Sequence, residues 1–172
     1  LTGVLHAIGR KGEKPAIPLN VVGDYGGGGM MLAFGLVCAL LETQQSGQGQ
    51  IVDCSIVDGV ASLMGFFYSQ LQAGIGSDER GGNMLDSGAF FYDVYETSDG
   101  KYVSIGSIEP QFFKELVTLL ELSESESAEW MQNQWTTKTW PQMADKLETL
   151  IKTKTRDAWC DIFEGSDVCF AP

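Results

Sequence analysis

The sequence predicts a mixed α/β fold divided into two domains. In the first half, a glycine-rich turn leads into an apolar helix and then into a strand-like segment. In the second half, a β-hairpin is followed by several amphipathic helices. A long loop rich in glycine and polar residues, around 75–88, joins the two halves. We therefore expect a first domain at residues 1–80 and a second at residues 81–172.

The first half is expected to alternate helix and strand. Met30–Gln45 is almost entirely apolar and predicts a mostly buried helix that ends at a Ser-Gly pair. Gln50–Ile56 alternates apolar and polar side chains, which is typical of a strand. Another apolar helix is expected from Val57 to about Ala73. A strand, a glycine-rich turn and buried helices together favour an α/β layer arrangement.

The second half begins with a hairpin and continues with helices. Phe91–Thr97 and Lys101–Ser107 are strand-like and are joined by the turn sequence Ser98-Asp99-Gly100. Pro110 stands where the first residue of a helix belongs, and Gln111–Leu122 is amphipathic behind it. The later segments are expected to be one acidic helix start or loop and two helices, at Ser123–Glu129, Pro141–Lys152 and Thr155–Phe163.

Composition and charge restrict the function. The chain has 172 residues and a formal net charge of −12, which argues against nucleic acid or an anionic membrane surface as the main partner. His6 is the one histidine, so a histidine-rich metal site is not expected. The longest apolar run, Met30–Leu41, is shorter than the roughly 20 residues that span a bilayer. We therefore expect no membrane insertion.

The cysteines and tryptophans are expected to be structural. Four cysteines without CxxC spacing predict buried free thiols in a reducing compartment. This favours an intracellular, cytoplasmic protein, or a mitochondrial or peroxisomal one in a eukaryote. The tryptophans are interpreted as core or amphipathic-helix packing, and they are Trp130, Trp135, Trp140 and Trp159.

Asp24 is the first candidate for a functional residue. It precedes the glycine run 26–29, which opens an apolar helix. Glycines let a backbone approach a ligand closely, and a helix start stabilises an anion. The alternative is that Asp24 only caps its own helix. The run matches neither GxGxxG nor a phosphate-binding loop, so a nucleotide site is not predicted.

Other candidates lie later in the chain. Glu109 sits between a strand and Pro110, a position that suits either a site carboxylate or an acid in the first turn of a helix. Asn83, Asp86 and Tyr92 lie on or beside the long loop, and long loops are often functional. His6 lies in an apolar segment and is interpreted as a satisfied, partly buried structural histidine.

Four separated motifs resemble a known family, in matching order over essentially the whole chain. They are Leu1-Thr2-Gly3-Val4-Leu5-His6-Ala7-Ile8-Gly9, Asn20-Val21-Val22-Gly23-Asp24-Tyr25-Gly26-Gly27-Gly28, Gly81-Gly82-Asn83-Met84-Leu85-Asp86 and Ile108-Glu109-Pro110-Gln111-Phe112. Together they resemble the alpha-methylacyl-CoA racemases of the family III CoA-transferase (CaiB/BaiF) superfamily. This resemblance implies that residues 1–80 are the C-terminal part of a large, Rossmann-like domain and that residues 81–172 form a small α+β domain.

The resemblance implies a reaction. Such racemases interconvert (R)- and (S)-2-methylacyl-CoA by removing the proton alpha to the thioester carbonyl and returning it on either face, through an enolate. It implies that Asp24 and Glu109 are catalytic: Asp24 matches one base, and Glu109 matches the glutamate that holds a catalytic histidine. The positions expected to bind substrate are Asn20, Tyr25, Gly26, Asn83, Leu85 and Tyr92. No metal or cofactor is expected, because the CoA thioester is itself the substrate.

The resemblance also implies that part of the site is supplied from elsewhere. The catalytic histidine of the family lies in a Gly-His-Asp motif just before the Leu-Thr-Gly run with which this sequence begins. We therefore expect a partial chain that is inactive by itself, with Arg10 and Lys11 among few basic groups for CoA. Family members form interlocked homodimers, so Asp24 would act with Glu109 of a second copy.

Two alternatives stay open at this stage. One is a CoA-transferase of the same superfamily, in which Asp24 is a nucleophile that forms a mixed anhydride with the acyl group. The other is a non-catalytic fragment that serves dimerisation or binding.

Overall fold

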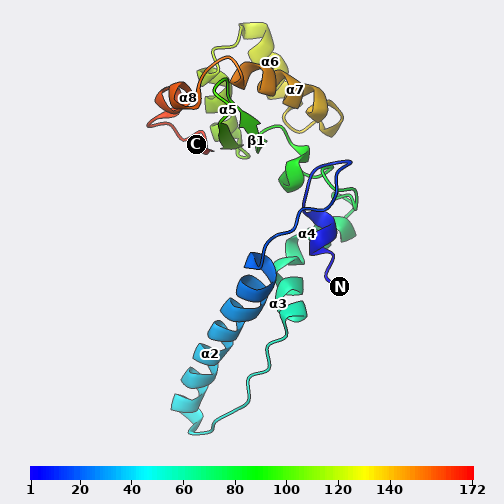
Figure 1. The fold of residues 1–172 in the computed structure, drawn as a ribbon, viewed down its shortest axis with the longest axis vertical. Coiled ribbons are helices and arrows are strands. Elements are labelled where there is room, and N and C mark those ends of the chain that lie inside the picture. Colours follow the sequence, from blue (N-terminus) through cyan, green and yellow to red (C-terminus); the bar gives the residue numbers. More distant parts are fainter. The chain divides into compact units, whose positions relative to one another are not determined.

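The computed structural model describes residues 1–172, and the chain divides into two compact units (Figure 1). Unit 1 is Leu1–Arg80 and unit 2 is Gly81–Pro172. Each unit is described by itself below. The mixed helix and sheet content agrees with the fold class predicted from the sequence, although the strands are confined to unit 2.

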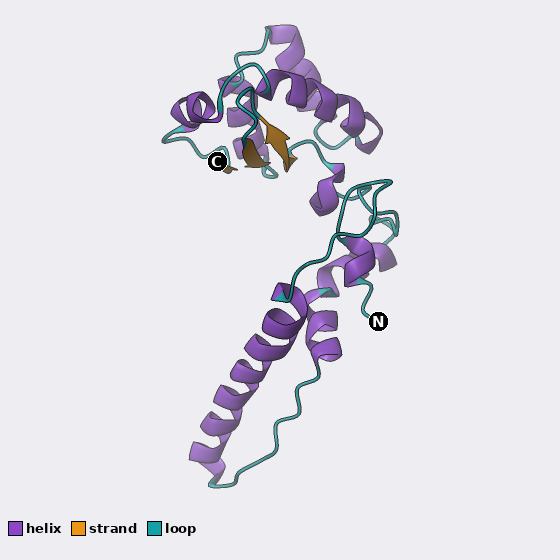
Figure 2. Ribbon diagram, viewed as in Figure 1, coloured by secondary structure: helices purple, strands orange, loops and turns teal.

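Unit 1 is built from helices and connecting segments alone (Figure 2). A π-helical segment, η1, leads without interruption into the long helix α2, and Gly47 ends α2 in a left-handed conformation with its N–H on the carbonyl of Thr43. The helical elements of unit 1 are α1 (Val4–Ala7), η1 (Val21–Met30), α2 (Met31–Ser46), α3 (Ile56–Leu63) and α4 (Gly65–Gln72).

The predicted strand at Gln50–Ile56 is wrong. Residues 47–55 form no helix or strand, and α3 begins at Ile56. An alternating pattern becomes a strand only when a neighbouring strand accepts and donates its backbone hydrogen bonds. Unit 1 offers no such neighbour, and Ile51 is 96% exposed.

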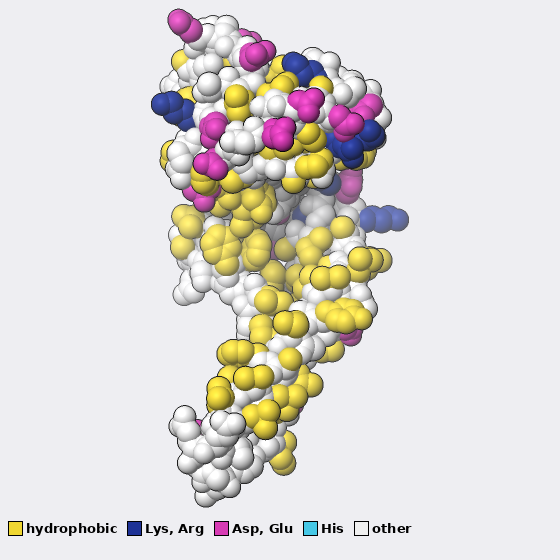
Figure 3. All heavy atoms as spheres, turned by 90° about the vertical axis from the view of Figure 1, so that its left-hand side faces the viewer, with side chains coloured by type: hydrophobic (Ala, Val, Ile, Leu, Met, Phe, Trp, Pro, Cys, Tyr) yellow, Lys and Arg dark blue, Asp and Glu magenta, His cyan; other side chains and the backbone are white.

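The prediction of a mostly buried helix is confirmed for its position and wrong for its burial. No residue of α2 is buried, and hydrophobic side chains lie along its surface down to a polar tip (Figure 3). The glycine run expected as a turn is helical, so Val21–Ser46 is one continuous helix of 26 residues with a mean hydropathy of 1.4. By length and composition it could cross a membrane, which is weak evidence, since core helices of soluble proteins also satisfy this criterion.

The glycine run is explained by the packing of η1 against α3. A Cβ atom at Gly27 would lie 2.5 Å from Cγ2 and 2.7 Å from the backbone nitrogen of Val60. A Cβ atom at Gly59 would overlap the carbonyl group of Gly27. The two backbones therefore touch at Gly27 and Gly59, and only glycine permits this approach. Close helix packing, which the sequence analysis did not consider, accounts for part of the run.

Unit 2 contains a three-stranded antiparallel sheet in the order β1-β2-β3. The predicted hairpin is confirmed as β1 (Tyr92–Glu96) and β2 (Tyr102–Gly106), with Tyr92 opposite Gly106. The third strand, β3 (Phe170–Ala171), was not predicted, because two residues are too few to show an alternating pattern.

The predicted helices of unit 2 are confirmed. Pro110 is the first residue of its helix, and Ser123 forms a capping box with Glu126 at the start of the acidic helix. The helical elements are η2 (Met84–Gly88), α5 (Pro110–Leu119), α6 (Glu124–Asn133), η3 (Thr137–Thr139), α7 (Trp140–Ile151) and α8 (Arg156–Phe163).

The core of unit 2 is rich in aromatic rings. Phe90 packs edge-on against Phe113 and Trp130, with ring centroids 5.7 Å apart in both pairs. Trp130, Trp140 and Trp159 are buried as expected. Trp135 is 55% exposed and lies in the turn after α6, where its ring packs edge to face with Phe91, so it belongs neither to the buried core nor to a helix face.

The cysteines are free but not buried. Cys38 and Cys169 are exposed, and Cys54 and Cys160 are partly buried. The apolar neighbours of these cysteines predict burial, and this prediction is wrong for Cys38 because it lies on α2, whose apolar surface is uncovered.

Candidate functional site

Asp24 lies in the first turn of η1 and is exposed. The N-cap of this helix is Asn20, so the interpretation of Asp24 as a cap is wrong. The Asp24 carboxylate forms no hydrogen bond or ion pair within the chain. The backbone N–H groups of a first turn have no partner inside the helix, and the helix dipole favours an anion there. Asp24 is therefore a solvent-accessible carboxylate at the positive end of a long helix.

The candidate residues around Asp24 share its helix. Asn20 is exposed, and its carbonyl accepts the backbone N–H of Tyr25 at 3.1 Å. The Tyr25 ring is 63% exposed. A Cβ atom at Gly26 would lie 3.1 Å from the carbonyl oxygen of Val21 and 3.3 Å from Cδ1 of Leu63, so Gly26 allows close packing there. Asn20, Asp24 and Tyr25 are all exposed at the start of this helix.

His6 is held by an acid that is distant in sequence. Its Nε2 atom lies 2.8 Å from the carbonyl oxygen and 3.3 Å from a carboxylate oxygen of Asp78. The expectation of a satisfied histidine is met, but the side chain is 56% exposed, so the expectation of partial burial is wrong. Lys11, expected to be available for CoA, pairs with Glu79 at 3.0 Å.

Glu109 occupies the junction between β2 and α5. It is the N-cap of α5, where its carbonyl oxygen accepts the N–H of Phe113 at 2.9 Å. Its side chain makes no capping hydrogen bond, is exposed, and pairs with no cation in the chain. The N-cap of α5 thus presents a second unpartnered carboxylate.

The loop residue Asn83 is engaged within its own loop. Asn83 is the N-cap of η2, and its side-chain amide donates to the Asp86 carboxylate at 2.7 Å. The backbone N–H groups of Gly81 and Asn83 donate to the same carboxylate at 3.0 and 2.8 Å. Asp86 therefore fastens the loop that places Leu85.

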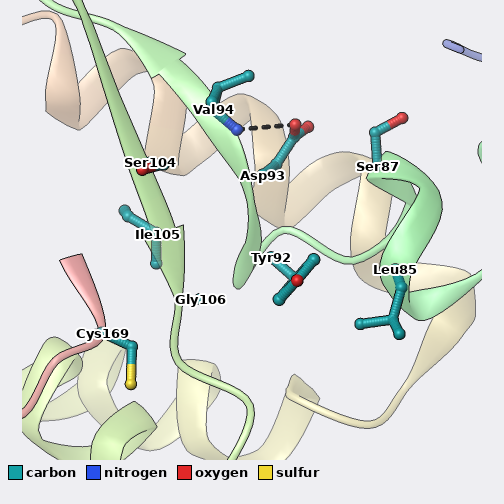
Figure 4. A pocket seen from close by; sticks show the side chains of 9 residues that line it. All are labelled: Leu85, Ser87, Tyr92, Asp93, Val94, Ser104, Ile105, Gly106 and Cys169. Atoms are coloured by element: carbon teal, nitrogen blue, oxygen red, sulfur yellow. Dashed lines mark hydrogen bonds between the residues drawn. The ribbon is translucent and has the colours of Figure 1, made fainter. Parts of the chain in front are cut away.

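Leu85 and Tyr92 line one open pocket of about 380 Å³ in unit 2 (Figure 4). The pocket lies over the sheet, between the η2 loop and the end of the chain, and the side chain of Asp93 accepts the N–H of Val94 at its rim. Its wall is completed by Ser87, Ser104, Ile105, Gly106 and Cys169. The structure thus brings Leu85 and Tyr92 together at a mostly apolar hollow.

Cys169 lines this pocket, and the charge of Glu109 acts on its thiol. Partial desolvation, followed by the negative charges of Glu109 and Asp167, raises the pKa of the Cys169 thiol. No sequence motif surrounds Cys169, so it could not be selected from the sequence.

The candidates fall into two groups, one in each unit. Asn20, Asp24, Tyr25 and Gly26 belong to unit 1, and Asn83, Leu85, Tyr92 and Glu109 belong to unit 2. No cluster of three or more His, Cys, Asp or Glu side chains suits a metal ion.

Comparison with known proteins finds similarity over the whole length of the chain. The sequence model described as "CoA-transferase family III" matches residues 1–172. The chain is 43% identical to "Alpha-methylacyl-CoA racemase" of Mus musculus and 41% identical to that of Homo sapiens, in each case over 172 residues. These matches cover 100% of the chain and 44% of each relative, so the chain spans less than half the length of these relatives.

A solved structure shares the fold. The crystal structure of a CaiB/BaiF family protein from Brucella suis superposes with a TM-score of 0.71 at 22% sequence identity. The superposition covers 99% of this chain and 45% of that protein.

Proposed function

Because this chain belongs to CoA-transferase family III, we propose that the polypeptide carrying it is a racemase that interconverts (R)- and (S)-2-methylacyl-CoA. One observation carries the proposal: identity of 41–43% to two proteins named alpha-methylacyl-CoA racemase extends over all 172 residues. The two exposed, unpartnered carboxylates, Asp24 and Glu109, fit this reaction.

The chemistry requires a base on each face of the substrate. The thioester carbonyl acidifies the α-hydrogen, so one base removes the proton and leaves a planar enolate, and a second base returns a proton from the opposite face. Asp24 is proposed as one base, because its carboxylate is open to solvent in the first turn of η1. The positive end of that helix also favours the developing enolate oxygen.

The second base is proposed to be a histidine from outside these 172 residues. His6, the one histidine here, is engaged by Asp78. Glu109 is proposed to hold and orient the second base, since its carboxylate has no other partner in the chain. Following the family pattern, the protein acts as an interlocked homodimer in which Asp24 of one copy works with Glu109 of another. No cofactor is needed, because the thioester supplies the activation.

The acyl-CoA substrate is proposed to be held partly by other segments. CoA carries several phosphate charges, and phosphate contacts favour Lys and Arg. Between Lys14 and Arg80 the sequence has no lysine or arginine. The substrate contacts assigned to unit 1 are therefore those near the thioester, from Asn20, Tyr25 and Gly26. In unit 2 the proposed contacts are Asn83, Leu85 and Tyr92, the last two at the apolar pocket.

Isotope exchange tests the proposal. The complete polypeptide encoded by the open reading frame that contains these residues is incubated with one enantiomer of a 2-methylacyl-CoA in D₂O. We expect deuterium at the α-carbon and gradual loss of optical purity. Absence of deuterium at the α-carbon after an incubation long enough for many turnovers per enzyme molecule would eliminate the racemase proposal.

A CoA-transferase is the second candidate, favoured by the family's own name. In that reaction Asp24 attacks the thioester carbon, the CoA thiolate leaves, and a mixed anhydride forms on the carboxylate. Hydroxylamine would convert such an anhydride into a hydroxamate at Asp24. Recovery of that adduct, together with transfer of CoA to a free carboxylate, would select this reaction over racemisation. A polypeptide that neither exchanges the α-proton nor forms a hydroxamate at Asp24 would instead be a non-catalytic binding or dimerisation protein.

A further inference from the structure

Glu109 can orient another group only if its own backbone is fixed. Its side chain is exposed and has no hydrogen-bond partner in the chain. It is the last residue of a short connection, residues 107–109, between β2 and α5. Within this connection the N–H of Ile108 donates to the carbonyl of Gly106 at 2.9 Å. This local contact alone does not tie the junction to the rest of unit 2.

The C-terminal segment holds one side of the junction. The N–H of Gly106 donates to the carbonyl of Cys169 at 2.9 Å. The hydroxyl of Ser107, which is completely buried, donates to the carbonyl of Val168. These two bonds join positions about sixty residues apart, just before the carboxylate-bearing residue.

A buried amide holds the other side. Gln134 follows α6 and is 3% exposed. Its Nε2 atom donates to the carbonyl of Ile108 at 2.9 Å and lies 3.5 Å from that of Ser107. The backbone carbonyl of Gln134 accepts the indole N–H of Trp140 at 2.8 Å, which holds the backbone that carries the amide. Buried polar groups are hydrogen-bonded in native structures, and this amide donates to the carbonyl of the residue directly before Glu109.

We propose that Gln134 and Ser107 are positioning residues for Glu109, an inference that rests on the role proposed above for Glu109. They tie residues 107 and 108 to two separate segments of unit 2, the C-terminal segment and the end of α6, so that the backbone directly before Glu109 is held in place. Catalytic geometry is sensitive to displacements of about 1 Å, so loosening this junction lowers turnover rather than substrate affinity.

The test replaces the amide with an apolar side chain of similar shape. In the complete encoded polypeptide, Gln134→Met removes the bond to Ile108, and Ser107→Ala removes the bond to Val168. We expect kcat for α-proton exchange to fall about 10- to 100-fold for Gln134→Met while KM changes less than about twofold. The pH profile of kcat should shift in the same direction as in Glu109→Gln, because both changes weaken support for the second base.

A double-mutant comparison separates positioning from general damage. If Gln134 acts through Glu109, Gln134→Met should change exchange less than about twofold in the Glu109→Gln background. Two controls are available. Thr97→Val removes another buried hydroxyl of the same sheet, at the far end of the hairpin. Gln132→Met makes the same substitution at an exposed position of α6. Neither should shift the pH profile.

The outcomes distinguish the two proposals. An active protein whose Gln134→Met and Ser107→Ala effects add fully to that of Glu109→Gln would overturn the positioning inference alone. A wild-type protein without exchange would reject the proposed function. Backbone amide hydrogen exchange then tests the junction by itself. Faster amide exchange at Ile108 and Phe113 in Gln134→Met, but not in Thr97→Val, supports the proposal that Gln134 holds this backbone. Unchanged amide exchange refutes it. Should Gln134→Met fail to fold, the same measurements on Ser107→Ala decide.

Discussion

The backbones of Gly27 and Gly59 touch where η1 crosses α3, so closely that a methyl group at position 59 would overlap the carbonyl group of Gly27. This contact places the segment that bears Asp24 directly against the next helix of unit 1. The glycine run is therefore required by packing at Gly27, whatever ligand approaches Asp24.

Gly59→Ala is expected to destabilise the protein by about 1–3 kcal/mol, the usual cost of forcing extra volume into a packed site. Alanine is the better helix former, but the added methyl group meets the rigid backbone of Gly27, which cannot rotate away. Chemical denaturation of the complete polypeptide measures the change. Gly65→Ala is the matched control, because Gly65 is also helical and nothing lies within 4 Å of an added Cβ. It should stabilise by about 0.5–1 kcal/mol. Equal effects of the two substitutions would contradict the contact.

Asp24→Asn and Glu109→Gln are each expected to lower α-proton exchange by about 10²- to 10⁴-fold, the usual contribution of a positioned acid or base. Both substitutions keep the size of the side chain and remove its charge, so the fold should be unchanged by circular dichroism. Asp58→Asn and Glu124→Gln are matched controls, since each removes an exposed acid from the first turn of another helix. Loss of α-proton exchange in the controls would show that the activity depends on the overall negative charge and not on these two positions.

Residues 1–172 alone are expected to show no racemase turnover. Asp24 is the one base proposed in this segment, and His6 is engaged by Asp78, so a second base is not expected within it. The measurement is deuterium incorporation into a 2-methylacyl-CoA over long incubation. Turnover by this segment, abolished by His6→Gln, would make His6 the second base and contradict the expectation.

Asp99 is expected to make unit 2 sensitive to acid. The Thr97 hydroxyl donates to its carboxylate at 2.6 Å, followed by the Arg156 backbone N–H at 3.1 Å, and together with Lys101 they hold the pKa of Asp99 well below its usual range. A lowered folded-state pKa stabilises the protein above the usual aspartate pKa of about 3.9, and this contribution disappears as the pH falls through the folded value. Asp99→Asn should therefore lower stability at pH 7 and reduce its decline between about pH 4 and pH 2. Denaturation midpoints of the wild type and of Asp99→Asn are measured across this pH range. If the two midpoints fall in parallel as the pH is lowered, Asp99 is not the source of the acid sensitivity.

The sequence predicted those elements that are determined by local hydrogen bonds. The turn at Ser98-Asp99-Gly100, the helix start at Pro110 and the helices that follow were correct, because each depends on neighbours within a few residues. The strand at Gln50–Ile56 failed because a strand also needs a distant partner. The glycine run was interpreted as a turn because glycine serves turns and close helix contacts alike.

The candidate site also contains residues that the sequence predicts from local position and residues that depend on distant partners. Asp24 and Glu109 could be selected from the sequence because both stand at helix starts, and the structure leaves both carboxylates exposed; their catalytic roles stay predictions. Gln134 and Ser107 could not be selected. Their partners lie 26 and 61 residues away, and no motif marks a glutamine or serine that meets a distant carbonyl.

The uncovered surface of α2 has a thermodynamic consequence. Val60 and Met64 are the only buried hydrophobic residues of unit 1, whereas unit 2 has a continuous aromatic core. Two such side chains cannot offset the conformational entropy lost in ordering eighty residues. We therefore expect folding of unit 1 to be linked to binding: a surface that covers α2 and binds only the folded form would raise its melting temperature with concentration. In a dilute solution of residues 1–172, unit 1 should therefore unfold first while unit 2 stays folded, and the region around Asp24 should lose its structure before the aromatic core does.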